Sequence, residues 1–400
     1  MSLNATPSGE RPHIAFFGLT NAGKSSLVNA ITSQDLSIVS EQKGTTTDPV
    51  QKAMEILPLG PVVLIDTPGL DDASALGAKR IARSLRVLAH TDLAVLVTEA
   101  GKALTEAEEA FVRKVKDEGI PYLCVANKID LCPNHAAIAK DCFPVSAKEG
   151  TGIAGLREHM ARLLSAPKEN TAILCRDLVG PSELCLLVIP IDSAAPKGRL
   201  ILPQQQVIRD LLEGEALCLV TSPNRLDQAL TTVHPKLVVC DSQVFDEVAR
   251  KTPEDIALTS FSILMARYKG YLASAIAGVQ AISQLKDGDT ILMAEGCTHH
   301  RQCEDIGTVK IPHWLQAHTG KKLNFTTSSG PDFPRDLSGI ALCVLCGGCM
   351  LNAREMQSRK DIALAQHIPV TNYGIVIAAM RGILKRATAM LPGYGGEKHA

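Results

Sequence analysis

The sequence has almost no net charge, few aromatic residues and no long apolar run. Its 41 Lys and Arg nearly balance its 42 Asp and Glu, so the chain lacks the basic footprint of a nucleic-acid-binding protein. No apolar run approaches the length of a membrane span. The first dozen residues lack the apolar core of a signal peptide and are predicted to be a loose leader. We therefore expect a cytoplasmic protein with neither a membrane nor a nucleic-acid partner.

Internal repeats and low-complexity segments are also missing, which excludes repeat proteins and disordered chains. What remains is a globular composition, 46% apolar and 21% charged over 400 residues, enough for two or three domains. Cysteine is more plentiful, at twelve residues. A reducing compartment makes disulfides unexpected. Four cysteines in apolar runs are predicted to be core residues: Cys124, Cys185, Cys218 and Cys240.

A glycine loop near the start of the chain predicts a phosphate-binding site. Gly18-Leu-Thr-Asn-Ala-Gly23-Lys24-Ser25 follows the apolar run 14–17 and opens a helical pattern over 26–31. Glycines let successive backbone N–H groups point at a phosphate, and the helix N-terminus adds partial positive charge. In such a loop Lys24 reaches the β- and γ-phosphates, and the Ser25 hydroxyl is a ligand of Mg²⁺.

Three further motifs follow in the order of a GTP site. The threonine-rich segment 44–48 supplies Thr46, with Thr45 and Thr47 as alternatives, for Mg²⁺ and the γ-phosphate. A predicted strand over 62–65 ends at Asp66-Thr-Pro-Gly69, which places a carboxylate for Mg²⁺ and a glycine N–H for the γ-phosphate. Another strand, 122–126, ends at Asn127-Lys128-Ile-Asp130. The Asp130 carboxylate can accept hydrogen bonds from guanine, and Ser146-Ala147-Lys148 can close the base pocket.

The predicted nucleotide and Mg²⁺ residues form one set across these motifs. We expect Lys24, Thr46, Asp66 and Gly69 to act in GTP hydrolysis. The full nucleotide-binding set is Asn21, Gly23, Lys24, Ser25, Ser26, Thr46, Asp66, Asn127, Lys128, Asp130, Ser146, Ala147 and Lys148.

These motifs resemble the Ras-like, translation-factor-related P-loop GTPases from about residue 14 to about residue 164. Leu70, Asp71 and Asp72 follow Gly69, so the water-orienting glutamine of Ras-like enzymes is missing. Asn21 and the Gly44-Thr-Thr switch are similar to GTPases of the Era and MnmE type, which implies K⁺ beside the phosphates with Asn21 as a ligand. The alternative for Asn21 is a left-handed turn residue. We predict slow GTP turnover that K⁺ stimulates.

The chain beyond the predicted linker at 166–171 alternates apolar runs with helical stretches as far as about residue 265. That pattern predicts a second α/β domain with a mainly parallel sheet. No glycine loop follows these strands, so a second nucleotide site is not expected. A polar loop at 192–200 is a surface connection or a partner site. A small domain without chemistry of its own suits an oligomer interface.

Cysteines follow two predicted strands in the last third of the chain. Strand 290–294 precedes Cys297-Thr-His299-His300, with Cys303 and Glu304 close behind, and strand 340–345 precedes Cys346-Gly-Gly-Cys349. In one parallel sheet the three thiols would converge at the carboxyl edge. Glycine N–H groups facing sulfur favour a zinc or 4Fe–4S site, while a Cys346–Cys349 redox pair would leave Cys297 unexplained. Cys343 is predicted to be core, and the two histidines have an alternative as surface-loop residues.

The combination of a potassium-type GTPase domain, Cys-x-His and Cys-x-x-Cys resembles the HydF family of FeFe-hydrogenase maturation GTPases over nearly the whole chain. The resemblance implies a GTPase domain at 10–168, a dimerisation domain at 176–265 and a 4Fe–4S cluster domain at 266–400, the last two being smaller α/β domains. It implies a homodimeric scaffold that receives a diiron precursor from radical-SAM maturases and passes it to apo-hydrogenase.

The same resemblance implies Cys297, Cys346 and Cys349 as cluster ligands, with His299 as the histidine of Cys-x-His. The family often has His immediately before Cys-x-x-Cys, and this chain has Leu345 there. The fourth ligand is therefore His299, Glu304, Cys303 or an exchangeable small molecule. An alternative function is a GTPase of tRNA modification or ribosome assembly whose C-terminal cysteines bind zinc.

Overall fold

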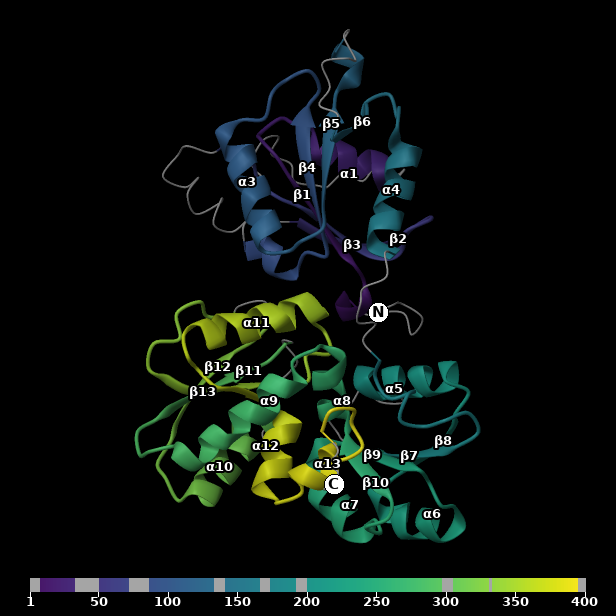
Figure 1. Ribbon diagram of the computed structural model, residues 1–400, viewed down its shortest axis with the longest axis vertical. Helices are drawn as coiled ribbons and strands as arrows, with labels where there is room; N and C mark the ends of the chain where they lie inside the picture. Colours follow the sequence, from purple (N-terminus) through teal and green to yellow (C-terminus); the bar gives the residue numbers. More distant parts are fainter. Residues whose placement is uncertain are drawn as a thin grey trace, which may run out of the picture. The chain divides into compact units, whose positions relative to one another are not determined.

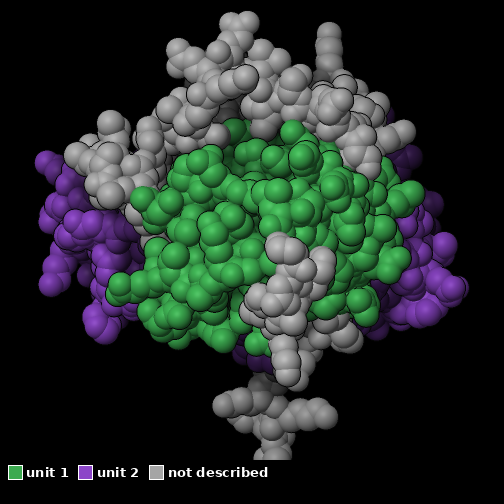
Figure 2. All heavy atoms as spheres, turned by 90° about the horizontal axis from the view of Figure 1, so that it is seen from above, with its two compact units in different colours: residues 1–170 green, residues 171–400 purple. Residues whose placement is uncertain are grey.

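The computed structural model describes residues 8–32, 50–71, 86–132, 141–165, 173–191, 200–296, 305–330 and 333–394. The chain forms two compact units, residues 1–170 and 171–400, which Figures 1 and 2 colour along the sequence and by unit. Among the helices in these ranges, none has the length and apolar character needed to cross a membrane.

The first unit is built on one six-stranded sheet. Its strand order is β2 (Val50–Ile56), β3 (Gly60–Asp66), β1 (His13–Phe17), β4 (Leu93–Glu99), β5 (Tyr122–Asn127) and β6 (Cys142–Pro144). Only the pairing of β2 with β3 is antiparallel. Its described helices are α1 (Lys24–Thr32), α3 (Glu106–Asp117) and α4 (Ile153–Ser165), with 3-10 turns at Ser8–Glu10, Leu88–His90 and Ile129–Leu131. This is the Ras-like arrangement predicted from the motifs.

Burial on both faces explains why the central strand β1 is a continuous apolar run. Phe16 packs into a cluster with residues of α1 and α4 on one face of the sheet. Phe17 packs on the other face against Phe111 of α3, with ring centroids 4.6 Å apart. Figure 1 shows α3 and α4 on opposite faces of this sheet. The helices therefore leave the carboxyl ends of the strands to the loops that carry the nucleotide motifs.

A disulfide joins Cys124 of β5 to Cys142 of β6. The expectation that the cysteines remain reduced is therefore wrong for this pair, whereas Cys124 is buried in the core as predicted. The two residues are partners in the parallel register, with Cα atoms 4.6 Å apart. The sequence pattern did not reveal this proximity, because it depends on how β6 pairs with β5.

The second unit contains two four-stranded sheets whose pairings are all parallel, as predicted. The first has the order β10 (Ala257–Ser260), β9 (Leu237–Cys240), β7 (Leu184–Val188) and β8 (Leu217–Thr221); the second has β12 (Asn324–Ser328), β11 (Thr290–Ala294), β13 (Ile340–Leu345) and β14 (Val370–Asn372). Its helices include α5 (Leu202–Glu213), α6 (Leu226–Thr232), α7 (Phe245–Lys251), α8 (Phe261–Tyr268), α9 (Leu272–Gly278), α10 (Ile311–Thr319), α11 (Ala353–Ala365), α12 (Tyr373–Met380) and α13 (Leu384–Thr388), and a π-helical turn covers Ile306–Lys310.

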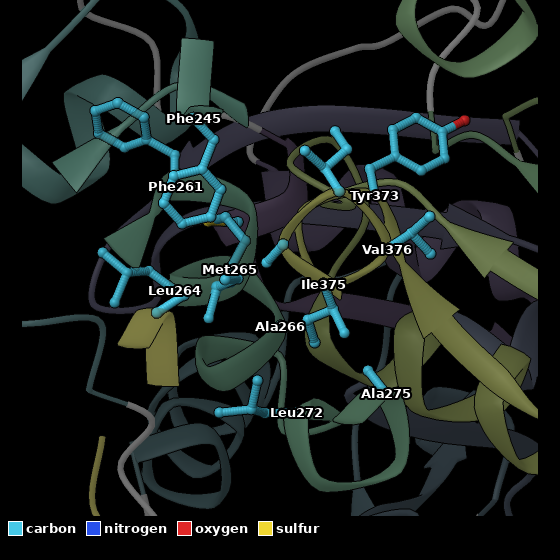
Figure 3. Packing of buried hydrophobic residues seen from close by; sticks show 14 of the residues in the cluster. Phe245, Phe261, Leu264, Met265, Ala266, Leu272, Ala275, Tyr373, Ile375 and Val376 are labelled. Carbon is cyan, nitrogen blue, oxygen red and sulfur yellow. The ribbon is translucent and has the colours of Figure 1, made fainter. Parts of the chain in front are cut away.

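One continuous core runs under both sheets of the second unit. Helix α8 directly follows β10 of the first sheet and packs against α12 and β14, which belong to the second part of the unit. Figure 3 shows side chains of α8 and α12, among them Met265 and Ile375, in this buried cluster. Arg386 of α13 reaches back and donates to the carbonyl oxygens of Ala249 (3.0 Å), Thr252 (2.9 Å) and Pro253 (2.5 Å).

Strand β8 forms an apolar edge of the first of these sheets. Among the described strands it pairs with β7 alone, and Leu217 and Val220 are 56% and 45% exposed. An edge strand presents unpaired backbone groups, and native proteins usually protect it with charge or cover it. The exposed aliphatic side chains therefore mark β8 as a surface suited to association.

Candidate functional site

The phosphate loop joins β1 to α1 at the carboxyl edge of the first sheet. Lys24 is only 8% exposed, and its Nζ donates to the carbonyl oxygens of Gly18 (3.1 Å) and Leu19 (2.8 Å). Burial lowers the pKa of Lys24, while the negative charges of Asp66 and Asp71 oppose that shift. Asn21 has φ of 63°, the left-handed conformation considered for it. Two loop carbonyl oxygens therefore hold the lysine ammonium in a buried position.

The two residues predicted for Mg²⁺ lie together. β1 and β3 are neighbours, with Phe16 opposite Asp66, and the Ser25 hydroxyl donates to Asp66 Oδ2 at 2.5 Å. Burial raises the pKa of Asp66, with the Ser25 hydroxyl and the Lys24 charge acting against it. Its Oδ1 is buried and has no hydrogen-bond partner within the described ranges. A hydroxyl beside an unsatisfied carboxylate oxygen fits Mg²⁺, which prefers oxygen ligands and can satisfy that oxygen.

The predicted guanine-binding residues are also brought together, and Asn127 connects them to the phosphate loop. Its side chain is buried, donates from Nδ2 to the Ala22 carbonyl (3.0 Å) and accepts at Oδ1 from the Ala147 amide (3.0 Å). The Ser146 hydroxyl donates to Asp130 Oδ1 at 2.7 Å, which orients the carboxylate predicted to read guanine. β5 thus ends in a rigid connection between the phosphate and base sites.

Further predicted residues surround this connection. Gly23 has φ of 91°, and a Cβ there would collide with the Asn127 amide, so a glycine is needed. Lys128 is in the left-handed conformation (φ of 65°) and its Nζ lies 3.4 Å from Glu99 Oε2. Ser26, in the first turn of α1, and Lys148 are exposed. Thr46, with its alternatives Thr45 and Thr47, lies outside the described residues.

Two residues that the sequence analysis did not assign to the site contact each other at the phosphate loop. The Asp71 carboxylate accepts from the Thr20 backbone N–H (2.7 Å) and from the Thr20 hydroxyl (2.8 Å). Gly69 lies against the same threonine, because a Cβ at Gly69 would collide with the Thr20 hydroxyl and approach Asp71 Oδ1 to 2.8 Å. The sequence signal for this contact was the acidic residue Asp71, two positions after Gly69, the glycine predicted to meet the γ-phosphate.

The cysteine loops lie at the carboxyl edge of the second sheet in the second unit. β11 and β13 are parallel neighbours, with Ala294 opposite Leu345, which meets the condition under which the thiols would converge. The Cys346 Sγ accepts from the backbone N–H groups of Gly296 (3.0 Å) and Gly348 (3.3 Å). Burial raises the pKa of Cys346, and these two amides and the Arg359 charge oppose the shift. Such N–H donors fit a thiolate that binds a metal or a cluster.

Cys349 is half-buried and packs against the core, and no disulfide joins it to Cys346. Between them Gly348 has φ of +63°, and a Cβ there would collide with Met356. Cys297 directly follows Gly296 in the sequence, but Cys297, His299, His300, Cys303 and Glu304 lie outside the described residues. Within the described ranges, no three potential ligands are grouped as a metal site.

The cysteines predicted to be core are mostly so. Cys343, Cys185 and Cys240 are fully buried, which confirms the prediction, and burial raises the pKa of Cys343 to about 12. Cys218 is half-buried on the edge strand β8.

Arg359 of α11 forms hydrogen bonds with two of the loops at this edge. It is 2% exposed and donates to the carbonyl oxygens of Glu295, at 3.4 Å, and Gly330, while its Nη2 lies 2.7 Å from Glu355 Oε1. The guanidinium therefore joins the residues that follow β11 and β12, and its charge partly opposes the rise that burial causes in the pKa of Cys346. A buried cation near thiolates offsets their negative charge.

Three family models match this chain. Residues 273–390 match the model of the hydrogen maturase F tetramerization domain, and residues 174–270 match that of the hydrogen maturase F dimerization domain. The chain belongs to the hydrogen maturase F family. Residues 13–128 match the model described as a 50S ribosome-binding GTPase, which accounts for the GTP and Mg²⁺ site of this hydrogen maturase F chain.

Two tRNA modification GTPases are similar to the GTPase domain of this chain. The tRNA modification GTPase MnmE of Nitrosomonas eutropha is 34% identical over 149 residues, 36% of this chain and 33% of that protein. MnmE of Halorhodospira halophila is 35% identical over 167 residues, 39% of this chain and 35% of that protein. The chain thus spans about a third of the length of the curated relatives it matches.

Solved structures give weaker likenesses. Era in complex with MgGDPNP and 16S ribosomal RNA has 16% identity and a TM-score of 0.34, covering 53% of this chain and 93% of that one. NFeoB from S. thermophilus, bound to GDP.AlF4- and K⁺, has 22% identity and a TM-score of 0.31, covering 40% and 66%. These TM-scores are too low to add to the fold assignment, which rests on the motifs and on the order of the strands.

Proposed function

We propose that this protein is a GTP-hydrolysing scaffold that binds a 4Fe–4S cluster and carries a diiron precursor from radical-SAM maturases to apo FeFe-hydrogenase. The observation that supports it most is the Cys346 thiol, which receives two backbone N–H groups, one of them from Gly296 immediately before Cys297. A 4Fe–4S cluster with one weakly held corner would supply an iron open to another molecule.

The chain's own residues would hold that cluster as follows. Cys297, Cys346 and Cys349 would be its thiolate ligands, with His299, Glu304 or Cys303 as candidates for the fourth position. The amides of Gly296 and Gly348 would hydrogen-bond the Cys346 sulfur, and Arg359 would offset negative charge. Residues 266–400 would form the cluster domain and 10–168 the GTPase domain.

The first test is an anaerobic iron and sulfide assay with absorption and EPR spectra on wild type and on Cys346→Ser. About four irons per chain, with the reduced-cluster EPR signal lost in the variant, would support the proposal. Cys218→Ser, a half-buried thiol on the other sheet, is the matched control and should retain the iron. About one zinc per chain with no iron uptake would overturn the proposal and favour an RNA-directed GTPase with a zinc site.

We also propose that the protein works in the cytoplasm as a homodimer, formed by residues 176–265 through the apolar edge of β8. Leu217 and Val220 are exposed there, and a second copy could extend the sheet. Leu217→Lys should shift the sedimentation equilibrium toward monomer. An unchanged dimer would exclude this edge as the interface.

For the GTPase, we propose potassium stimulation with Asn21 near the phosphates. GTP turnover should be faster in KCl than in NaCl of equal ionic strength, and Asn21→Ala should abolish the difference. Equal wild-type rates in the two salts would refute it. Coupling to the cluster would appear as different hydrogenase affinities in the GTP and GDP states.

A further inference from the structure

Asp71 places a negative charge on the phosphate loop. Its carboxylate occupies the backbone N–H of Thr20 at 2.7 Å and the Thr20 hydroxyl at 2.8 Å. Thr20 lies between Gly18 and Gly23, inside the loop whose N–H groups are expected to face phosphate. A side-chain anion therefore already holds one amide of an anion-binding loop.

The position of this contact within the loop follows from Gly69. Gly69 is the glycine predicted to meet the γ-phosphate, and it packs so closely on Thr20 that a Cβ would collide with the hydroxyl. Asp71 is also near enough to Lys24 for each charge to shift the other's pKa. Lys24 is the residue expected to reach the β- and γ-phosphates. Asp71 thus sits at the γ-phosphate end of the loop.

We propose that Asp71 is a specificity-determining residue that disfavours GTP relative to GDP by charge repulsion with the γ-phosphate. GDP ends one phosphate earlier and leaves the contact between Asp71 and Thr20 in place. GTP brings additional negative charge to the same region, so its binding is weakened or displaces the carboxylate from Thr20. Asp71 is exposed, so solvent screens the repulsion, and we expect an effect of about threefold to tenfold on relative affinity.

The test separates the charge of Asp71 from its hydrogen bonds. Asp71→Asn keeps a carbonyl oxygen that can accept from Thr20 but removes the charge, whereas Asp71→Ala removes both. Titration calorimetry with Mg²⁺ measures Kd for GDP and for a non-hydrolysable GTP analogue on nucleotide-free full-length protein. Asp117→Asn is the charge-matched control, because Asp117 ends α3, next to the start of β5 and at the opposite edge of the sheet from the phosphate loop.

We expect both Asp71 variants to bind the GTP analogue about threefold to tenfold more tightly relative to GDP, with Asp117→Asn unchanged. In wild type, the Kd for the GTP analogue divided by the Kd for GDP should also fall as salt rises, and this ratio should respond less to salt in Asp71→Asn. An unchanged ratio in Asp71→Asn, or a ratio altered only in Asp71→Ala, would overturn the proposal in favour of a hydrogen-bonding role. Weaker relative binding of the GTP analogue by Asp71→Asn would overturn it as well.

Discussion

Replacing Asn127 by Ala should destabilise the first unit even without nucleotide. The side chain is 2% exposed and satisfies the Ala22 carbonyl and the Ala147 amide, each at 3.0 Å. Ala22 is buried, so its carbonyl would lose its partner at a cost of about 1–3 kcal/mol. Ala147 is half-buried and water can partly replace its bond, which adds about 1 kcal/mol. The free energy of unfolding should therefore fall by about 2–4 kcal/mol.

Asn127→Asp makes the test more specific. Its carboxylate can still accept from the Ala147 amide, but it faces the Ala22 carbonyl oxygen without a proton to donate. The loss at neutral pH should equal or exceed that of Asn127→Ala. Acid should reverse it, because repulsion and burial raise the folded pKa of the new carboxyl above its unfolded value, and its protonated form can donate to Ala22. Stability should recover as pH falls through that folded pKa.

Urea denaturation followed by far-ultraviolet circular dichroism measures both variants. The single tryptophan, Trp314, lies in α10 of the second unit, so its fluorescence reports that unit separately. Asn324→Ala removes one exposed amide contact, Nδ2 to the Gly288 carbonyl, and serves as the control with a smaller expected loss. Wild-type stability of Asn127→Ala, or no recovery of Asn127→Asp in acid, would refute the reasoning.

Three further predictions concern the phosphate-loop lysine, an ion pair and a closely packed glycine. Lys24→Met should leave the nucleotide-free stability unchanged or raise it, because burial disfavours the charged lysine, while isothermal titration should show GTP affinity reduced at least about 100-fold. Burial would raise the pKa of Asp177, but the Arg267 guanidinium outweighs it and the pKa is lowered. This pair should therefore stabilise the second unit at pH values above the ordinary carboxyl pKa, and the stabilisation should be lost as pH falls through the lowered folded pKa. Acid denaturation of Asp177→Asn should lack this pH-dependent loss. Gly278→Ala should lower the second unit's unfolding free energy by about 1–3 kcal/mol in Trp314 fluorescence, because a Cβ there meets the backbone carbonyl of Val370.

Local motifs predicted which residues come together at the carboxyl edge of the first sheet, because each motif directly follows a strand. Ser25 and Asp66 meet because β1 and β3 are neighbours, an arrangement that the Ras-like resemblance implies. The contact of Thr20 with Asp71 was not predicted, since it depends on how the chain turns after Gly69. A sequence pattern predicts which residues end a strand, but it does not predict which atoms of the following loops are in contact.

At the cysteine loops, too, the strands could be predicted from the sequence but the loop contacts could not. Two apolar runs predicted the strands β11 and β13, but that they are neighbours was only a condition of the predicted site, which the structure meets. The amide donors to Cys346 were only a general expectation from its glycines, and the structure identifies them as Gly296 and Gly348. The Cys124–Cys142 disulfide was missed because the three-residue strand β6 is too short for its sequence pattern to predict that it pairs with β5.

The reach of Arg386 across the second unit has a consequence for the order of folding during synthesis. The carbonyl groups that it binds, from Ala249 to Pro253, leave the ribosome more than a hundred residues before the arginine does. Nascent chains ending near residue 270 therefore lack both this clamp and the α12 partner of α8. We expect such chains to remain protease-sensitive until α13 has emerged, so that the two sheets become resistant together rather than one after the other.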